Sequence, residues 1–274
     1  MTICIYHGNC ADGFGAAWAI RQAIPEAKFY AATYQAPPPT DVSHKRVVMV
    51  DFSYKRPVLL EMASEAESIL ILDHHKSAAE DLVDLPANVV AVFDMERSGA
   101  MMAWQHFFPD VPPPRLIEHI QDRDLWRFAL PGTREIQANL FSYPYDFDVW
   151  DELMASDVEA LRSDGAAIER KHHKDIAELV KVTKRRMVIG GFNVPVANLP
   201  YTLSSDAGHL MGQDEPFAAC YWDTPAGRVF SLRSHEAGQD VSAIAKRYRG
   251  GGHRHAAGFQ VPHGHILGSY SEEG

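Results

Sequence analysis

Residues able to do chemistry follow short apolar segments at three places in the chain. They are His7 after residues 3–6, Asp51 after residues 47–50, and Asp73-His74-His75 after residues 69–72. Titratable groups at such positions need partners or a metal ion, because burying an isolated charge is costly. Histidine and carboxylate together suit Mn²⁺, Zn²⁺ or Mg²⁺, with Mn²⁺ a natural match for mixed N and O donors. Two such ions ~4 Å apart would activate water and neutralise a phosphoryl transition state.

The segments that must position these residues alternate in type along the first half of the chain. Strands are predicted at residues 3–6, 47–50, 69–72 and 89–93, and helices at 13–23, 57–67 and 98–108. Continuous β-branched runs are typical of strands covered on both faces. Alternation of strand and helix predicts a doubly wound parallel sheet. The carboxyl ends of its strands form the ligand crevice, so the chemical residues should converge there.

The second half of the chain changes character twice. Three prolines at 112–114 introduce a new helix, and residues 149–186 are polar and helical. Short strands separated by glycine and polar turns follow from residue 187, with a helix near 241–248. We therefore predict an α/β protein with a catalytic domain (1–150), a helical connector (151–186) and a smaller α/β domain (187–265). The active site is expected in the cleft between the domains.

Composition narrows the class of protein. The chain is 46% apolar and 23% charged, which is ordinary for a soluble globular protein. No apolar run approaches the roughly 20 residues that cross a bilayer, and the N-terminus has no signal-peptide pattern. Three cysteines form no dense disulfide framework, so we expect a cytoplasmic protein with no membrane association. The net charge of −10 argues against binding to long duplex nucleic acid, although metal ions could still attract a small anion.

The ordered set of motifs resembles the DHH–DHHA1 phosphoesterases, which are named for the triplet present here as Asp73-His74-His75. Residues 6–13 are similar to the first family motif, Val50-Asp51 to the second, and residues 121–126 to the fourth. Arg233-Ser234 and residues 250–259 resemble the DHHA1 signature. The resemblance thus runs from residue 6 to residue 259 and implies the fold and the cleft described above.

The resemblance also implies individual roles. Asp51 would bridge two metal ions, one held with His7 and the other with Asp12, His74 and Asp122. Asp73 would orient a histidine through its ring N–H, and His75 would face the scissile phosphate as donor or acid. In the second domain, the residues implied in substrate binding are Arg233, Ser234, Gly251, Gly252 and His253.

Some assignments stay open from the sequence. Asp51 by itself suits a helix cap, and Asp124 is the alternative to Asp122. The first motif lacks one of its usual aspartates, and the position falls on Asn9 or Cys10. A Cys10 thiolate would favour a softer ion such as Zn²⁺, whereas Asn9 would offer a neutral oxygen.

Two further motifs admit a plain structural interpretation. Residues 250–252 are three glycines, which could form a helix cap and turn or an anion-binding nest of backbone N–H groups. His172-His173 copies two letters of the triplet but has no strand before it, so we place it on the surface.

These observations predict a metal-dependent phosphoesterase that cleaves phosphodiester bonds of short oligonucleotides with water activated by two metal ions. One alternative keeps the chemistry and changes the substrate to polyphosphate, to cyclic or linear dinucleotides, or to other phosphorylated nucleotides. A second is a weakly catalytic nucleotide-binding sensor, motivated by the missing aspartate. The oligomeric state is left open, with a homodimer as one option.

Overall fold

The computed structural model describes residues 1–33, 36–39 and 41–268. The chain forms two compact units, Met1–Glu169 and Arg170–Gly274, whose boundary falls inside α8 (Val158–Thr183). Residues 151–186, expected to be a connector, contribute Leu153 and Leu161 to a core of the first unit. They also contribute Ile176 and Val180 to a core of the second. Within the described residues, no helix is long and apolar enough to span a membrane.

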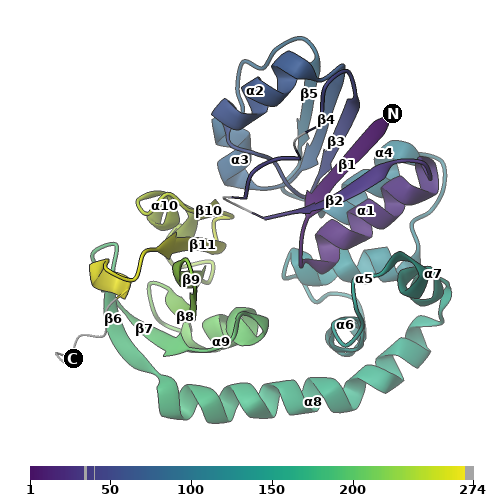
Figure 1. Cartoon of the computed structure of the whole chain (residues 1–274). Coiled ribbons are helices and arrows are strands. Elements are labelled where there is room, and N and C mark those ends of the chain that lie inside the picture. Colours follow the sequence, from purple (N-terminus) through teal and green to yellow (C-terminus); the bar gives the residue numbers. More distant parts are fainter. Residues whose placement is uncertain (34–35, 40, 269–274) are drawn as a thin grey trace. The chain divides into compact units, whose positions relative to one another are not determined.

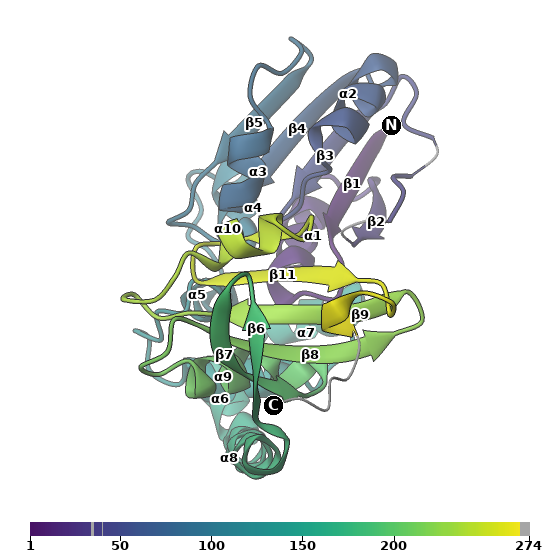
Figure 2. The same cartoon turned by 90° about the vertical axis from the view of Figure 1, so that its left-hand side faces the viewer.

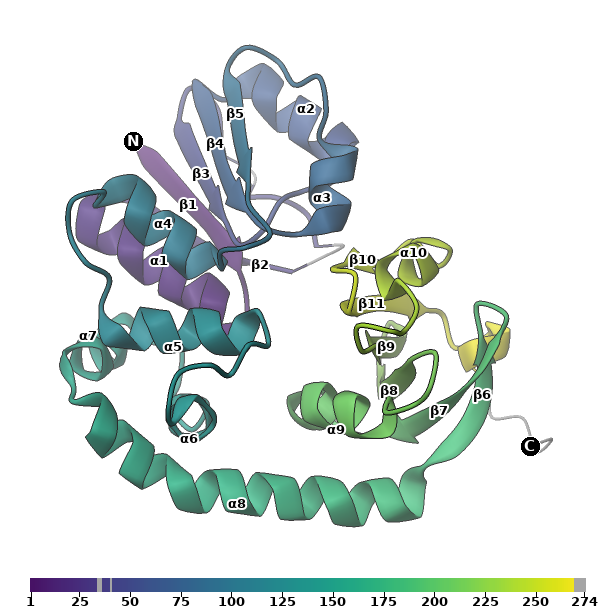
Figure 3. The ribbon, with the colours of Figure 1, turned by 180° about the vertical axis from the view of Figure 1, so that it is seen from behind.

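The first unit is built on a five-stranded parallel sheet with strand order β2-β1-β3-β4-β5. The strands are β1 (Thr2–His7), β2 (Lys28–Ala32), β3 (Arg46–Val50), β4 (Ser68–Asp73) and β5 (Val89–Phe93). Helices α1 (Ala11–Ala23) and α4 (Gly99–Phe107) cover one face, and α2 (Arg56–Glu65) and α3 (Lys76–Asp81) the other (Figures 1 and 3). The doubly wound sheet predicted from the sequence is confirmed.

Two separate cores explain why the central strands are continuously apolar. Val48 and Leu72 face a core built on Phe14 and Trp104 of α1 and α4. Met49 and Ile71 face the opposite core, which contains Leu59 and Met62 of α2. The edge strand β2 was not predicted because most of its residues are exposed and its sequence, KFYAA, has no β-branched residue. The short helix α3 was also missed.

Three more helices complete the first unit. They are α5 (Arg115–Asp124), α6 (Thr133–Leu140) and α7 (Phe147–Ala155). Helix α5 begins directly after the three prolines, as predicted, and buries Leu116, Ile117 and Ile120 against α1 and α4. Its last residue, Asp124, therefore ends close to the carboxyl edge of the sheet.

The second unit contains a six-stranded mixed sheet with strand order β10-β11-β9-β8-β7-β6. The strands are β6 (Arg185–Ile189), β7 (Phe192–Asn198), β8 (Ala218–Thr224), β9 (Gly227–Arg233), β10 (Gly251–Gly252) and β11 (Ala256–Val261). Helix α10 (Val241–Lys246) packs on β10 and β11, and α9 (Ser204–Met211) packs on β8 and β9 (Figure 2). Short 3₁₀ turns lie at Tyr201–Leu203 and Ile266–Gly268.

Candidate active site

The chemical residues of the first unit gather at the carboxyl ends of β1, β3 and β4. The chain passes from β1 to β2 on one side and then returns to place β3 on the other side of β1. Such a switch point leaves a crevice outside the strand ends. His7 ends β1, Asp51 follows β3, and Asp73 ends β4. The convergence predicted from strand order is therefore present.

Asp51 lies between two groups of possible metal ligands. The first group consists of Asp12, Asp51 and His74, and the second of His7, Asp51 and His75. In each group, one ligand atom from every residue lies within 4.8 Å of the others. Asp51 does not cap a helix, because α2 begins only at Arg56. Its backbone is left-handed, with φ of 52°, a conformation that is uncommon for residues other than glycine and tends to mark functional sites.

The amino end of α4 holds the second acid in place. Gly99 N and Ala100 N donate to the two carboxylate oxygens of Asp12, at 2.5 and 2.9 Å. A helix amino end favours negative charge, since its backbone N–H groups lack partners within the helix. A Cβ atom at Gly99 would lie 2.4 Å from Asp51 Cβ, so only glycine allows this approach. These two amides were not foreseen from the sequence.

His74 joins the acids through one ring nitrogen. Its Nε2 lies 3.1 Å from Asp51 Oδ1, 3.7 Å from Asp12 Oδ2 and 3.5 Å from Asp124 Oδ2. These distances are short enough for a hydrogen bond to Asp51 and, with the ring neutral, for a shared cation. On the other side of Asp51, His7 Nδ1 lies 3.4 Å from Oδ2.

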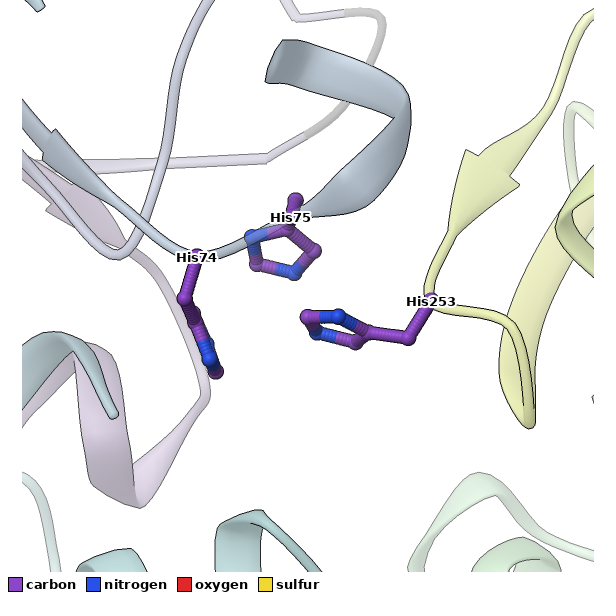
Figure 4. Close-up of side chains that lie close together, drawn as sticks. All are labelled: His74, His75 and His253. Atoms are coloured by element: carbon purple, nitrogen blue, oxygen red, sulfur yellow. The ribbon is translucent and has the colours of Figure 1, made fainter. Parts of the chain in front are cut away.

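Asp73 orients His75 rather than His74. Its Oδ1 accepts from His75 Nδ1 at 2.7 Å and from the backbone N–H of His74 at 2.8 Å, while Ser53 Oγ donates to Oδ2 at 3.0 Å. Although burial opposes it, the charge and hydrogen bond of His75 keep the pKa of Asp73 low. Because the carboxylate can only accept, Nδ1 of His75 carries the proton. The rings of His74 and His75 leave the end of β4 at 69° to each other (Figure 4).

The structure corrects the choice between the two acids of α5. Asp122 is committed to the following turn: its carboxylate accepts from Ala129 N, Leu130 N and Thr133 Oγ1 at 2.6–3.0 Å. Asp124 instead lies beside His74. Asp122 is therefore not the acid of this cluster, because its oxygens satisfy backbone groups of a turn, and Asp124 takes that place.

Of the two residues at the missing aspartate, Cys10 is the one near the cluster. Its thiol is hydrogen-bonded to His7, and burial, followed by the charge of Asp51, raises its pKa. Asn9 is exposed, with a left-handed backbone at φ of 56°.

The electrostatics of the cluster fit a cation. Three carboxylates lie around His74, those of Asp12 and Asp51, which are buried, and that of Asp124, which is partly exposed. Burial and mutual repulsion raise the pKa of Asp12 and of Asp124. Asp51 Oδ2 is buried and, apart from the 3.4 Å contact with His7 Nδ1, meets no hydrogen-bond donor among the described residues. A divalent ion would satisfy this oxygen together with the excess negative charge.

The residues expected to bind substrate gather at one edge of the second sheet. Ser234, which follows β9, donates its backbone N–H to His255 O and lies 3.0 Å through its hydroxyl from His255 Nδ1. Arg233 is already engaged: its guanidinium donates to Ser231 Oγ, Leu232 O and Ser205 Oγ at 2.8–2.9 Å. Arg233 thus ties β9 to α9, whatever else it contacts.

The three glycines are explained largely by the close approach of β10 and β11. Gly252 has φ of 138°, and a Cβ atom there would lie 2.5 Å from Ala256 O, while Gly251 pairs with Gly258. The backbone N–H of His253, which follows β10 (Figure 4), donates to Ala256 O. Gly250 N donates to Ala245 O. An anion nest formed by these two amides is therefore excluded, and the glycines serve the hairpin.

His172-His173 behaves as expected for a helical surface pair. Both residues lie in α8, and His172 Nε2 contacts Asp206 Oδ2 at 3.1 Å.

The chain is 33% identical over 285 aligned residues to uncharacterized protein R106 of Acanthamoeba polyphaga mimivirus, covering 94% of this chain and 67% of that protein. No family model matches. RecJ from Thermus thermophilus, whose structure was solved in complex with Mn²⁺, has a TM-score of 0.52 at 14% identity. That match covers 95% of this chain and 49% of RecJ.

A further similar structure is the pGpG-specific phosphodiesterase PggH of Vibrio cholerae, with a TM-score of 0.49 at 12% identity over 95% of this chain and 93% of that one. The chain shares the fold of RecJ. It belongs to one family with the mimivirus protein R106.

Proposed function

We propose that this protein is a metal-dependent phosphoesterase that hydrolyses phosphodiester bonds of short oligonucleotides. The observation that carries the proposal is the position of Asp51, a buried carboxylate that belongs to two ligand groups at once. A bridging carboxylate is what two dications in close proximity require, since it places negative charge between them. The negative net charge of the chain favours a short substrate over a long duplex.

The residues that would hold the ions are His7 with Asp51 on one side, and Asp12, His74 and Asp124 with Asp51 on the other. Their mixed nitrogen and oxygen donors favour Mn²⁺, with Mg²⁺ or Zn²⁺ as alternatives. Bound dications would supply an activated water and neutralise charge on the phosphoryl group.

The protein's own groups would orient the reaction. Asp73 holds the ring of His75 with its proton on Nδ1, so Nε2 is the atom through which His75 would meet a phosphoryl oxygen or the leaving group. Ser53 and the backbone N–H of His74 keep Asp73 in place. The α4 amides do the same for Asp12, which limits reorganisation during the reaction.

Two alternatives to the oligonucleotide phosphoesterase are compatible with the same cluster. The same chemistry would act equally on polyphosphate or on cyclic and linear dinucleotides, because the residues of the cluster would meet only the phosphoryl group of the substrate. A nucleotide-binding sensor is the second alternative, favoured by Cys10 in place of an acidic ligand.

Metal analysis combined with a substrate panel tests the proposal. We expect the purified protein to retain Mn²⁺ and to release mononucleotides from dinucleotides and trinucleotides faster than from a long duplex. Phosphate release from polyphosphate alone would move the assignment to the first alternative. Nucleotide binding without any turnover in the Mn²⁺-loaded protein would favour the sensor.

A further inference from the structure

Among the described residues, Arg123 pairs with no carboxylate, unlike Arg97, Arg115 and Arg127 of the same unit. Arg127 pairs with Glu96 at 2.9 Å, Arg97 pairs with Asp94 at 2.7 Å, and Arg115 also pairs with an acid. Among the described residues, no ion pair or side-chain hydrogen bond engages the guanidinium of Arg123. An arginine carries five N–H donors, and no nitrogen of Arg123 is among the buried unsatisfied atoms, so these donors are open to solvent or to a ligand.

Aromatic rings fix the position of this guanidinium. Its Cζ lies 5.5 Å from the ring centroid of Trp126 and 5.2 Å from that of Phe141. Contacts with ring faces restrict a guanidinium without consuming its N–H donors. The rings therefore restrict the Arg123 side chain, while its N–H donors remain available to a further acceptor.

The surrounding turn brings Arg123 next to the acid cluster. Arg123 directly precedes Asp124, and its positive charge acts on that carboxylate. Trp126 and Phe128 have positive φ values of 56° and 48°, and the carboxylate of Asp122 fastens the residues that follow. A plain structural role, a cation at the carboxyl end of α5, would explain the charge but not the contacts with two aromatic rings.

We propose that Arg123 binds a phosphate group of the substrate beside the metal cluster. The planar fork donates two parallel hydrogen bonds to phosphate oxygens, which is the geometry that distinguishes arginine from lysine. The proposal rests on the proposed function, since the phosphate would belong to the nucleotide cleaved at the same site. Arg123 would position that substrate. Trp126 and Phe141 would hold the guanidinium in the position from which it binds the phosphate.

The test compares Arg123→Met with Arg127→Met in the Mn²⁺-loaded full chain. Methionine keeps a long apolar stem on the rings and removes the fork, while Arg127 is an exposed arginine of the same turn already paired with Glu96. We expect Arg123→Met to weaken binding of adenosine 5′-monophosphate and inorganic phosphate, and to raise KM for a dinucleotide, on the order of 10- to 100-fold. Arg123→Lys should recover only part of the loss, and Arg127→Met should match the wild type.

Metal affinity separates this role from a structural one. Removing a positive charge beside a cation site should leave Mn²⁺ affinity unchanged or slightly higher. Lower Mn²⁺ content in Arg123→Met would mean that the residue supports Asp124, and unchanged phosphate binding would also overturn the proposal. If the wild-type protein cleaves no substrate, only the proposed function fails. Phosphate binding to the wild type and to Arg123→Met, measured by calorimetry, still decides the role of Arg123.

Discussion

Motif residues lie both at the carboxyl edge of the first sheet and in the glycine hairpin of the second unit. The two regions differ in whether the polar groups of these residues find partners within the protein. At the first edge, Asp12, Asp51 and Asp124 gather around one histidine, and Asp51 keeps a buried oxygen that, apart from its contact with the histidine that ends β1, finds no donor among the described residues. In the hairpin, strand pairing accounts for Gly252 and the amide of His253, and the amide of Gly250 donates to Ala245 O of α10. A motif residue points to a ligand when the fold leaves it unsatisfied, and the first edge meets that condition far better than the hairpin does.

The substitution with the largest expected effect is Asp51→Asn, which tests whether the carboxyl edge of the first sheet holds the metal ions. It removes the charge shared by both ligand groups, so we expect turnover to fall at least ~10³-fold, about 4 kcal/mol in the barrier. Folding should survive because the change is isosteric and local. Steady-state kinetics measures turnover, thermal unfolding checks the fold, and elemental analysis gives the metal content.

The matched control for that substitution is Asp94→Asn, which alters an acid after the adjacent strand that is already bonded to Arg97. Near-normal activity of a metal-loaded Asp51→Asn protein would remove the two-metal assignment.

A paired substitution in α5 separates a ligand from a structural acid. Asp124→Asn should lower metal content and activity while leaving the metal-free protein as stable as before, or more so, because it relieves repulsion with Asp12. Asp122→Asn should instead cost about 2 kcal/mol by weakening three hydrogen bonds, or roughly 5 °C in Tm. Thermal unfolding and metal analysis of both variants provide the measurement, and the reverse pattern would restore Asp122 as the ligand.

Arg233→Ala tests whether the second unit also contributes to binding. Loss of its bonds to Ser205 and Ser231 should lower the Tm, and loss of a charge-assisted phosphate contact should raise KM on a dinucleotide ~10-fold or more. Metal content and cleavage of a small generic ester should stay the same. Arg247→Ala, which removes a surface contact to Gly190 O, controls for stability alone. An equal loss on both substrates would mean that Arg233 only maintains the fold.

The smallest expected effect is that of Cys10→Ser. Burial raises the pKa of the Cys10 thiol, and hard phosphate chemistry favours oxygen and imidazole ligands. Metal preference and activity should therefore stay close to wild type, whereas Cys10→Asp should tighten metal binding by adding a carboxylate. A switch in metal preference after Cys10→Ser, measured by elemental analysis after dialysis, would identify the thiolate as a ligand.

Sequence alone determined the doubly wound sheet and the convergence of its strand ends. Strands such as those at residues 47–50 and 69–72 can be predicted from their apolar runs, because both faces of each strand are buried. In a parallel sheet, the carboxyl ends of these strands must then meet at one edge. Strand β2 was missed because an edge strand needs no such run.

Only the tertiary structure decided between Asp122 and Asp124. The two acids are two positions apart on one helix, so they point in different directions, and no local pattern tells which direction faces the cluster. The packing of α5 on α1 and α4, together with the turn that Asp122 fastens, turns Asp124 toward His74. The same packing leaves Arg123 beside the rings of Trp126 and Phe141, and Phe141 is a neighbour brought close only by folding.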